Sequence, residues 1–244
     1  MKKTAAMLMA IWMLALMLTA CGQQAPEQTG GTVEPGAQSD DAVEPGAAQD
    51  QSVTGQVDAS QPDEEELEMG SVNGGTYTNT FAGIGCALDE TWVFYTKEQI
   101  AELNGFLTDG TSDEDMKKLM ENSQSVQDMY ASSTDGLMTI NVVFQNMGLL
   151  LGTTMSAQEY AELHVTQIPD AMAAYGFEDV AASVTTAELA GEERPAIALT
   201  ATIQDIPVYE LIVCLRQGNY IYCVTLCSYT EDVTAQMAEL FYAL

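Results

Sequence analysis

Cysteine is the residue type of this sequence with the most distinctive chemistry, because a thiol can be acylated, oxidised or bound to a metal. The chain contains five cysteines, and none of them forms the Cys-x-x-Cys spacing of metal or redox sites. Cys223 and Cys227 are four residues apart in a predicted strand. They point to the same face but lie too far apart to bond or to share a metal. The two cysteines that can meet are Cys214 and Cys223, which flank a turn.

The turn between these two cysteines is predicted at Gly218-Asn219, because both residue types tolerate the positive φ of two-residue hairpin loops. In that register Gln217 faces Tyr220, and Cys214 faces Cys223 at a non-hydrogen-bonded position. The Cα atoms of such a pair are about 4.5 Å apart, which suits a disulfide. In an oxidising compartment a Cys214–Cys223 bond could form, whereas in a strict anaerobe the two thiols would stay reduced.

Cys21 stands apart from the other cysteines because it follows an uncharged stretch at the N-terminus. Met1-Lys2-Lys3 is basic, and residues 4–20 carry no charge, which is the layout of an export signal. The junction Leu18-Thr19-Ala20-Cys21 resembles the lipobox of bacterial lipoproteins. The resemblance implies cleavage before Cys21, diacylglyceryl transfer to its thiol and often acylation of the new amine. The sequence therefore predicts a signal peptide over 1–20 and a lipid anchor on Cys21, of the palmitate-bearing kind, on the extracytoplasmic face of the cell membrane.

Other side chains that could do chemistry form no recognisable site. His164 is the only histidine, and no cysteine or acid stands at metal-ligand spacing from it, so a packing role is predicted. The acids of Asp109–Asp113 lack the alternation and the downstream Glu of an EF-hand, which leaves weak calcium binding as an alternative. No glycine-rich phosphate loop is present. We expect no enzyme, no metal site and no cofactor.

The charge of the chain excludes two classes of partner. Seven Lys and Arg against 36 Asp and Glu give a net charge of −29. Lys2 and Lys3 leave with the signal, so the mature chain carries 5 − 36 = −31. So few basic residues cannot form a footprint for nucleic acid, nor attach the protein to anionic lipid. Attachment to the membrane must therefore depend on the covalent lipid.

Composition divides the mature chain into a linker and a domain. Residues 21–72 contain 12 Asp and Glu, no Lys or Arg and no aromatic residue, so a disordered acidic linker is predicted. All ten Tyr and all six Phe lie from Tyr77 onward. Residues 73–244 are therefore predicted to form a single domain.

Periodicity predicts that this domain is α+β, with a mostly antiparallel central sheet and helices packed on its faces. Both faces of the later strands are largely apolar, which requires cover on both sides. A capping box opens one of the expected helices at Ser156. Strands are expected over 76–88, 92–96, 137–145, 180–189, 195–203, 206–216 and 219–229, and helices over 97–104, 112–131, from 157 onward, and 230–244.

The order of these elements is similar to that of the PsbP-like fold, shared by the photosystem II extrinsic subunit and by many small bacterial lipoproteins. Tyr77-x-Asn79-x-Phe81-x-Gly83, then Trp92 and a helix, would open the domain. Tyr209-Glu210, Gly218-Asn219-Tyr220 and a final helix would close it. The resemblance covers about residues 75–244. It implies binding and assembly roles more than catalysis, and it supplies no site residues for this chain.

These features favour a non-catalytic binding or assembly module of the cell envelope, with a protein or cell-wall partner. A small-ligand or lipid carrier that uses the space between sheet and helices is the alternative. A hydrolase that depends on carboxylates alone is less favoured.

Overall fold

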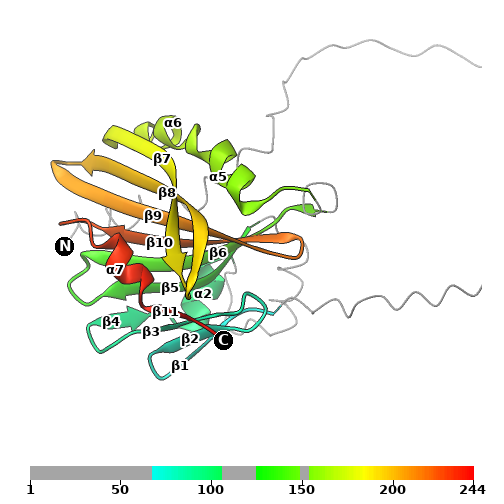
Figure 1. Ribbon diagram of the computed structural model, residues 1–244. Helices are drawn as coiled ribbons and strands as arrows, with labels where there is room; N and C mark the ends of the chain where they lie inside the picture. The colour runs from blue at the N-terminus through cyan, green and yellow to red at the C-terminus, as the bar shows by residue number, and fades with distance from the viewer. Residues whose placement is uncertain (1–67, 106–124, 149–153) are drawn as a thin grey trace, which may run out of the picture. The chain divides into compact units, whose positions relative to one another are not determined.

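The computed structural model describes residues 68–105, 125–148 and 154–244, and their strands form two antiparallel sheets (Figure 1). The predicted signal peptide, Cys21, nearly all of the predicted linker and Asp109–Asp113 lie outside the described residues.

The larger sheet has seven strands in the order β4-β5-β6-β10-β9-β8-β7. Its second half is a meander of consecutive neighbours, as predicted. The strands of this sheet are β4 Trp92–Phe94, β5 Ser125–Ser133, β6 Met138–Asn146, β7 Glu178–Leu189, β8 Glu192–Ile203, β9 Ile206–Gln217 and β10 Tyr220–Ser228.

Two-residue turns set the register of the meander. Ala190-Gly191 and Gln204-Asp205 both have positive φ at each residue, which is the type I′ geometry. Gly218 has a φ of 55°, and Asn219 is not among the residues of positive φ, so this turn follows the type II′ pattern. The predicted pairing of Gln217 with Tyr220 is confirmed.

The smaller sheet was not predicted. Its order is β1-β2-β3-β11, with β1 Ser71–Asn73, β2 Thr76–Asn79, β3 Ile84–Ala87 and β11 Phe241–Ala243. The single strand expected over 76–88 is wrong, because a turn divides it. The N–H of Ala82 donates to Asn79 Oδ1, the N–H of Gly83 donates to the carbonyl of Thr80, and Gly83 has a φ of 69°.

The long C-terminal helix expected over 230–244 is also wrong. Only α7, Thr234–Ala238, is helical, and the chain then continues as β11 beside β3. Phe241 reaches the core as expected, but from a strand that faces Cys86. The apolar spacing at the end of the chain suits either element. Pairing with β3 satisfies backbone groups that a free helix end would leave open.

The helix expected over 112–131 is wrong in its described part, because residues 125–131 belong to β5. A β-bulge between Gln127 and Met129 adds one residue to the strand. Val126 and Met129 therefore bury their side chains in the same core although they are three residues apart. That spacing imitates one turn of a helix.

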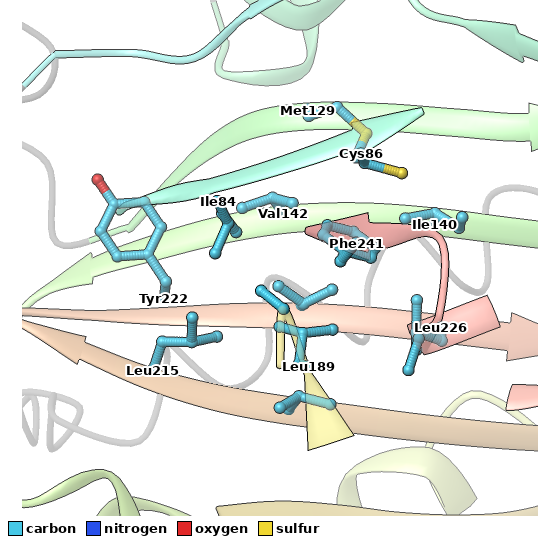
Figure 2. Close-up of a cluster of buried hydrophobic side chains, with 14 of the residues drawn as sticks. Ile84, Cys86, Met129, Ile140, Val142, Leu189, Leu215, Tyr222, Leu226 and Phe241 are labelled. Carbon is cyan, nitrogen blue, oxygen red and sulfur yellow. The ribbon is translucent and has the colours of Figure 1, made fainter. Parts of the chain in front are cut away.

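The first core lies between the two sheets (Figure 2). Tyr77, Cys86 and Phe241 of the small sheet are buried with the strands of the large sheet. From the large sheet Ile140, Val142, Leu215, Tyr222 and Leu226 contribute. This face of the large sheet is thus covered by a second sheet. The expected α+β class with helices on the sheet faces, which the PsbP-like resemblance also implied, is wrong, and the fold is mostly antiparallel β.

A second core lies on the other face of the large sheet, next to two short helices. α5, Ala157–Val165, opens with the predicted capping box, since Ser156 and Glu159 bond reciprocally. α6, Ile168–Ala173, begins at the residue before Pro169. Their buried side chains pack with β8, β9 and β10. The predicted helix at 97–104 is confirmed as α2, Lys97–Leu103.

Candidate functional site

Cys214 and Cys223 face each other across β9 and β10, as the Gly218-Asn219 turn predicted. Both residues are buried and both are free thiols. A hydrogen bond to Cys223, with burial second, raises the pKa of the Cys214 thiol well above its ordinary value. Because the thiolate is the reactive form, the pair is poorly reactive in the folded protein. These two cysteines are close together, but they do not form an open reactive site.

His164 is buried on the inner side of α5, with its ring centroid 4.1 Å from that of Tyr160. Burial lowers the pKa of its imidazole, so the neutral form is favoured. Within the described ranges no group of three or more His, Cys, Asp or Glu could hold a metal ion. His164 is thus packed against Tyr160 on the buried face of α5.

Glu210 is a buried carboxyl group that the sequence did not single out. It lies on β9, opposite Cys227 of β10 and Leu199 of β8. Its side chain lies on the same face of the sheet as Val208 and Ile212, inside the second core. Burial raises the pKa of Glu210 to about 8, so it is mostly protonated at neutral pH. In sequence Glu210 is a single acid that interrupts a largely apolar strand, and no local pattern indicates its burial.

Asp128 is the second buried carboxyl group that the sequence did not single out. It stands in the β-bulge of β5 and accepts hydrogen bonds from Tyr77 Oη at 2.5 Å and Asn79 Nδ2 at 2.7 Å. Its other oxygen accepts from the N–H of Gly70 at 2.7 Å. Burial raises the pKa of Asp128, while these hydrogen bonds oppose the rise. Asp128 thus links β2 of the small sheet, and Gly70 just before β1, to the large sheet.

A groove of about 590 Å³ lies between the end of the β7–β8 hairpin and α7. Its wall includes Thr185 to Glu188 of β7 and residues of the helical segment that leads to β11. Its lining residues include the acids Asp232 and Glu239 beside α7, and Glu188 of β7. The Glu188 side chain points to the other face of the sheet, because its neighbours Ala187 and Leu189 pack in the first core. All three residues are exposed. The groove therefore offers a negative surface to the solvent.

Asp232 has a defined position in this groove. Its Oδ1 accepts hydrogen bonds from the hydroxyl of Thr234 at 2.7 Å and from the N–H of the same residue at 3.2 Å. These bonds stabilise the start of α7. The nearest basic residue along β8, Arg194, forms its ion pair with Glu192 at 2.8 Å, and neither residue lines the groove.

The groove continues onto the outer strand of the large sheet. β7 ends the seven-strand order, and every residue from Glu178 to Glu188 is exposed or half-buried. By contrast, β10 is buried along nearly its whole length. The sequence predicted β7 as a strand but gave no sign that it lies at an edge. The groove brings together residues about fifty positions apart, which no local pattern indicates.

Comparison with known proteins gives no match, either to a protein-family model or to a curated protein. None of the helices in the described ranges combines the length and the apolar character of a membrane span.

Proposed function

We propose that this protein is a lipid-anchored, extracytoplasmic binding module of the cell envelope that recognises a protein or wall component without catalysis. One observation carries the binding role. The thiols of the four described cysteines, the imidazole of His164 and the carboxyl group of Glu210 are buried, whereas β7 and the groove beside it are exposed. Reactive groups without access to solvent suit a scaffold, and an exposed edge suits recognition.

The anchor part of the proposal depends on the lipobox-like residues before Cys21. Globomycin, or Cys21→Ser, should leave an unprocessed precursor that keeps the signal peptide. The readout is the N-terminal mass of the protein in the membrane fraction. Normal cleavage of the Cys21→Ser variant would contradict lipidation at this residue.

The binding part is tested by photo-crosslinking in living cells. A photoreactive amino acid is placed at one exposed position at a time over the described surface, including Asn73 of β1 and Thr186 of β7. We expect a discrete crosslinked product from a contiguous group of positions. If no position gives a product, the binding role is contradicted.

The alternative of a small-ligand or lipid carrier has less support. The space between α5, α6 and the large sheet is filled by side chains: Tyr160, Ile168 and Met172 are each at most 2% exposed. Packing of this kind leaves no room for a ligand at that place.

A further inference from the structure

β7 differs from the other sheet edges in length. The two sheets have four edge strands, of which β1, β4 and β11 each contain three residues. β7 contains twelve residues. Among the described strands it pairs only with β8, so its other edge has no strand partner there. Proteins usually protect a long edge with Lys, Pro or a bulge in its middle. The only bulge of β7 is at its start, between Glu178 and Ala181.

The turn at Ala190-Gly191 determines which backbone groups of β7 face outward. Leu189 and Glu192 close this two-residue hairpin, so Leu189, Ala187, Thr185 and every second residue before them bond to β8. The N–H and C=O groups of Ala182, Val184 and Thr186 therefore point away from the sheet. They form a row of donors and acceptors that another strand could pair with.

Charges mark both ends of this row. Residues 180–187 carry no charge, while Glu178 and Asp179 precede them and Glu188 follows. Glu188 lies directly opposite Glu193 of β8, and like charges at such a position destabilise a sheet. The side chains of Glu188 and Glu193 are exposed and lie on the face of the sheet opposite α7, because Ala187 and Leu189 pack in the first core. A cation placed beside this pair would relieve the repulsion.

Two occupants from this protein itself fit poorly. Antiparallel pairing of β7 with the β7 of a second copy would bring Asp179 of one strand near Glu188 of the other, between chains of strong negative charge. The residues before the domain, 22–67, contain acids and no Lys or Arg, so they would add negative charge to the same edge.

We propose that β7 binds an extended segment of another polypeptide, which adds as a strand along Ala182–Thr186 and places a Lys or Arg beside the carboxylates of Glu188 and Glu193. This inference rests on the proposed binding function and names the partner chemistry. Backbone hydrogen bonds supply affinity, and the basic residue at the end selects the partner and its direction.

The test uses the purified protein from Cys21 to Leu244 and a synthetic peptide of alternating valine and threonine with lysines at both ends. Ala182→Pro with Thr186→Pro removes two outward N–H groups and leaves the bonds to β8 intact. The matched control is Ala182→Thr with Thr186→Val, which keeps both N–H groups. We expect the proline variant to bind the peptide about tenfold or more weakly than the control, by fluorescence anisotropy.

The charge part is tested with Glu188→Gln and Glu193→Gln together. We expect weaker binding of the lysine peptide, a smaller dependence of affinity on salt, and no binding of the same peptide with glutamates in place of lysines. Far-ultraviolet circular dichroism and thermal unfolding confirm that each variant is folded before its affinity is compared.

Equal affinity of the folded proline and control variants would overturn strand addition. If the protein associates with itself and the proline variant abolishes this association, the partner of β7 is a second copy of the chain and not another polypeptide. The cellular crosslinks separate this inference from the proposed function. If other positions give a crosslinked product but Thr186 does not, strand addition at β7 is contradicted while the proposed binding function is supported.

Discussion

Asp128 and Glu210 are both buried carboxyl groups, but they lie on opposite faces of the seven-stranded sheet and have different surroundings. Asp128 accepts three hydrogen bonds from the segment that forms the small sheet. No described residue donates a hydrogen bond to Glu210, and burial alone determines its pKa shift. A buried acid can therefore hold two parts of a fold together, or it can destabilise the folded state by an amount that depends on pH.

The first prediction breaks the contacts of Asp128. Asp128→Ala leaves the buried Tyr77 Oη and Asn79 Nδ2, and the half-buried N–H of Gly70, without their acceptor. We expect the free energy of unfolding to fall by roughly 3–5 kcal/mol, because each buried unsatisfied donor costs about 1–3 kcal/mol. Urea unfolding measures the change. Asp128→Asn keeps one acceptor oxygen and should lose less, so an equal loss in both variants would contradict the role of these hydrogen bonds.

The second prediction concerns the pH dependence that Glu210 causes. Its pKa is raised to about 8 in the folded state from 4.5, so the folded state keeps a proton that the unfolded state loses. Its favourable contribution is complete below about pH 4.5 and is lost as the pH rises through about 8. Relative to Glu210→Gln, the wild type should lose roughly 2–4 kcal/mol of stability over this range.

Denaturant unfolding of both proteins at a series of pH values measures this difference. Subtracting the variant from the wild type removes the contribution of the many surface acids. Asp205→Asn, an exposed acid in the turn between β8 and β9, is the matched control and should show no such trend. If the difference in unfolding free energy between wild type and Glu210→Gln stays constant with pH, the raised pKa of Glu210 is contradicted.

The third prediction uses the thiols that share the second face with Glu210. Oxidised glutathione added during refolding should join Cys214 to Cys223, with loss of two thiols from the protein and formation of two reduced glutathione molecules. In the folded protein the reaction should be slow, because the pKa of Cys214 is raised and both thiols are buried. The bond should stabilise the fold by only about 2–3 kcal/mol, because a disulfide that closes a short loop restricts the unfolded chain less than one that closes a long loop.

Thiol titration and peptide mapping identify the bond. Cys227→Ser should still form it, because Cys227 faces Glu210 rather than Cys214. Cys223→Ser should not. A disulfide that joins any other pair after refolding would show that the hairpin register does not guide oxidation.

The parts of this molecule that depend on local signals could be predicted from the sequence. The meander, the pairing of Cys214 with Cys223 and the capping box at Ser156 each follow from residues close together in the chain. The small sheet could not be predicted, because β11 joins β3 from more than 150 residues away. Asp128 and Glu210 were missed for the same reason. Their environments are built by strands distant in sequence, and a lone acid in a strand carries no sign of its burial.

The smallest predicted effect concerns the strand that completes the small sheet. Tyr242 of β11 lies directly opposite Gly85 of β3, and its ring covers the glycine, so that a Cβ at Gly85 would lie 2.5 Å from a ring carbon. An aromatic side chain across from a glycine in this way shields a backbone that has no side chain of its own. Tyr242→Ala should therefore cost about 1 kcal/mol of unfolding free energy. Gly85→Ala should also destabilise the wild type, because the new methyl group meets the ring. In the Tyr242→Ala background the ring is absent, so the same Gly85→Ala change should cost little or stabilise the strand. A double-mutant cycle by urea unfolding measures this coupling. Additive effects of the two substitutions would show that the ring does not lie on Gly85.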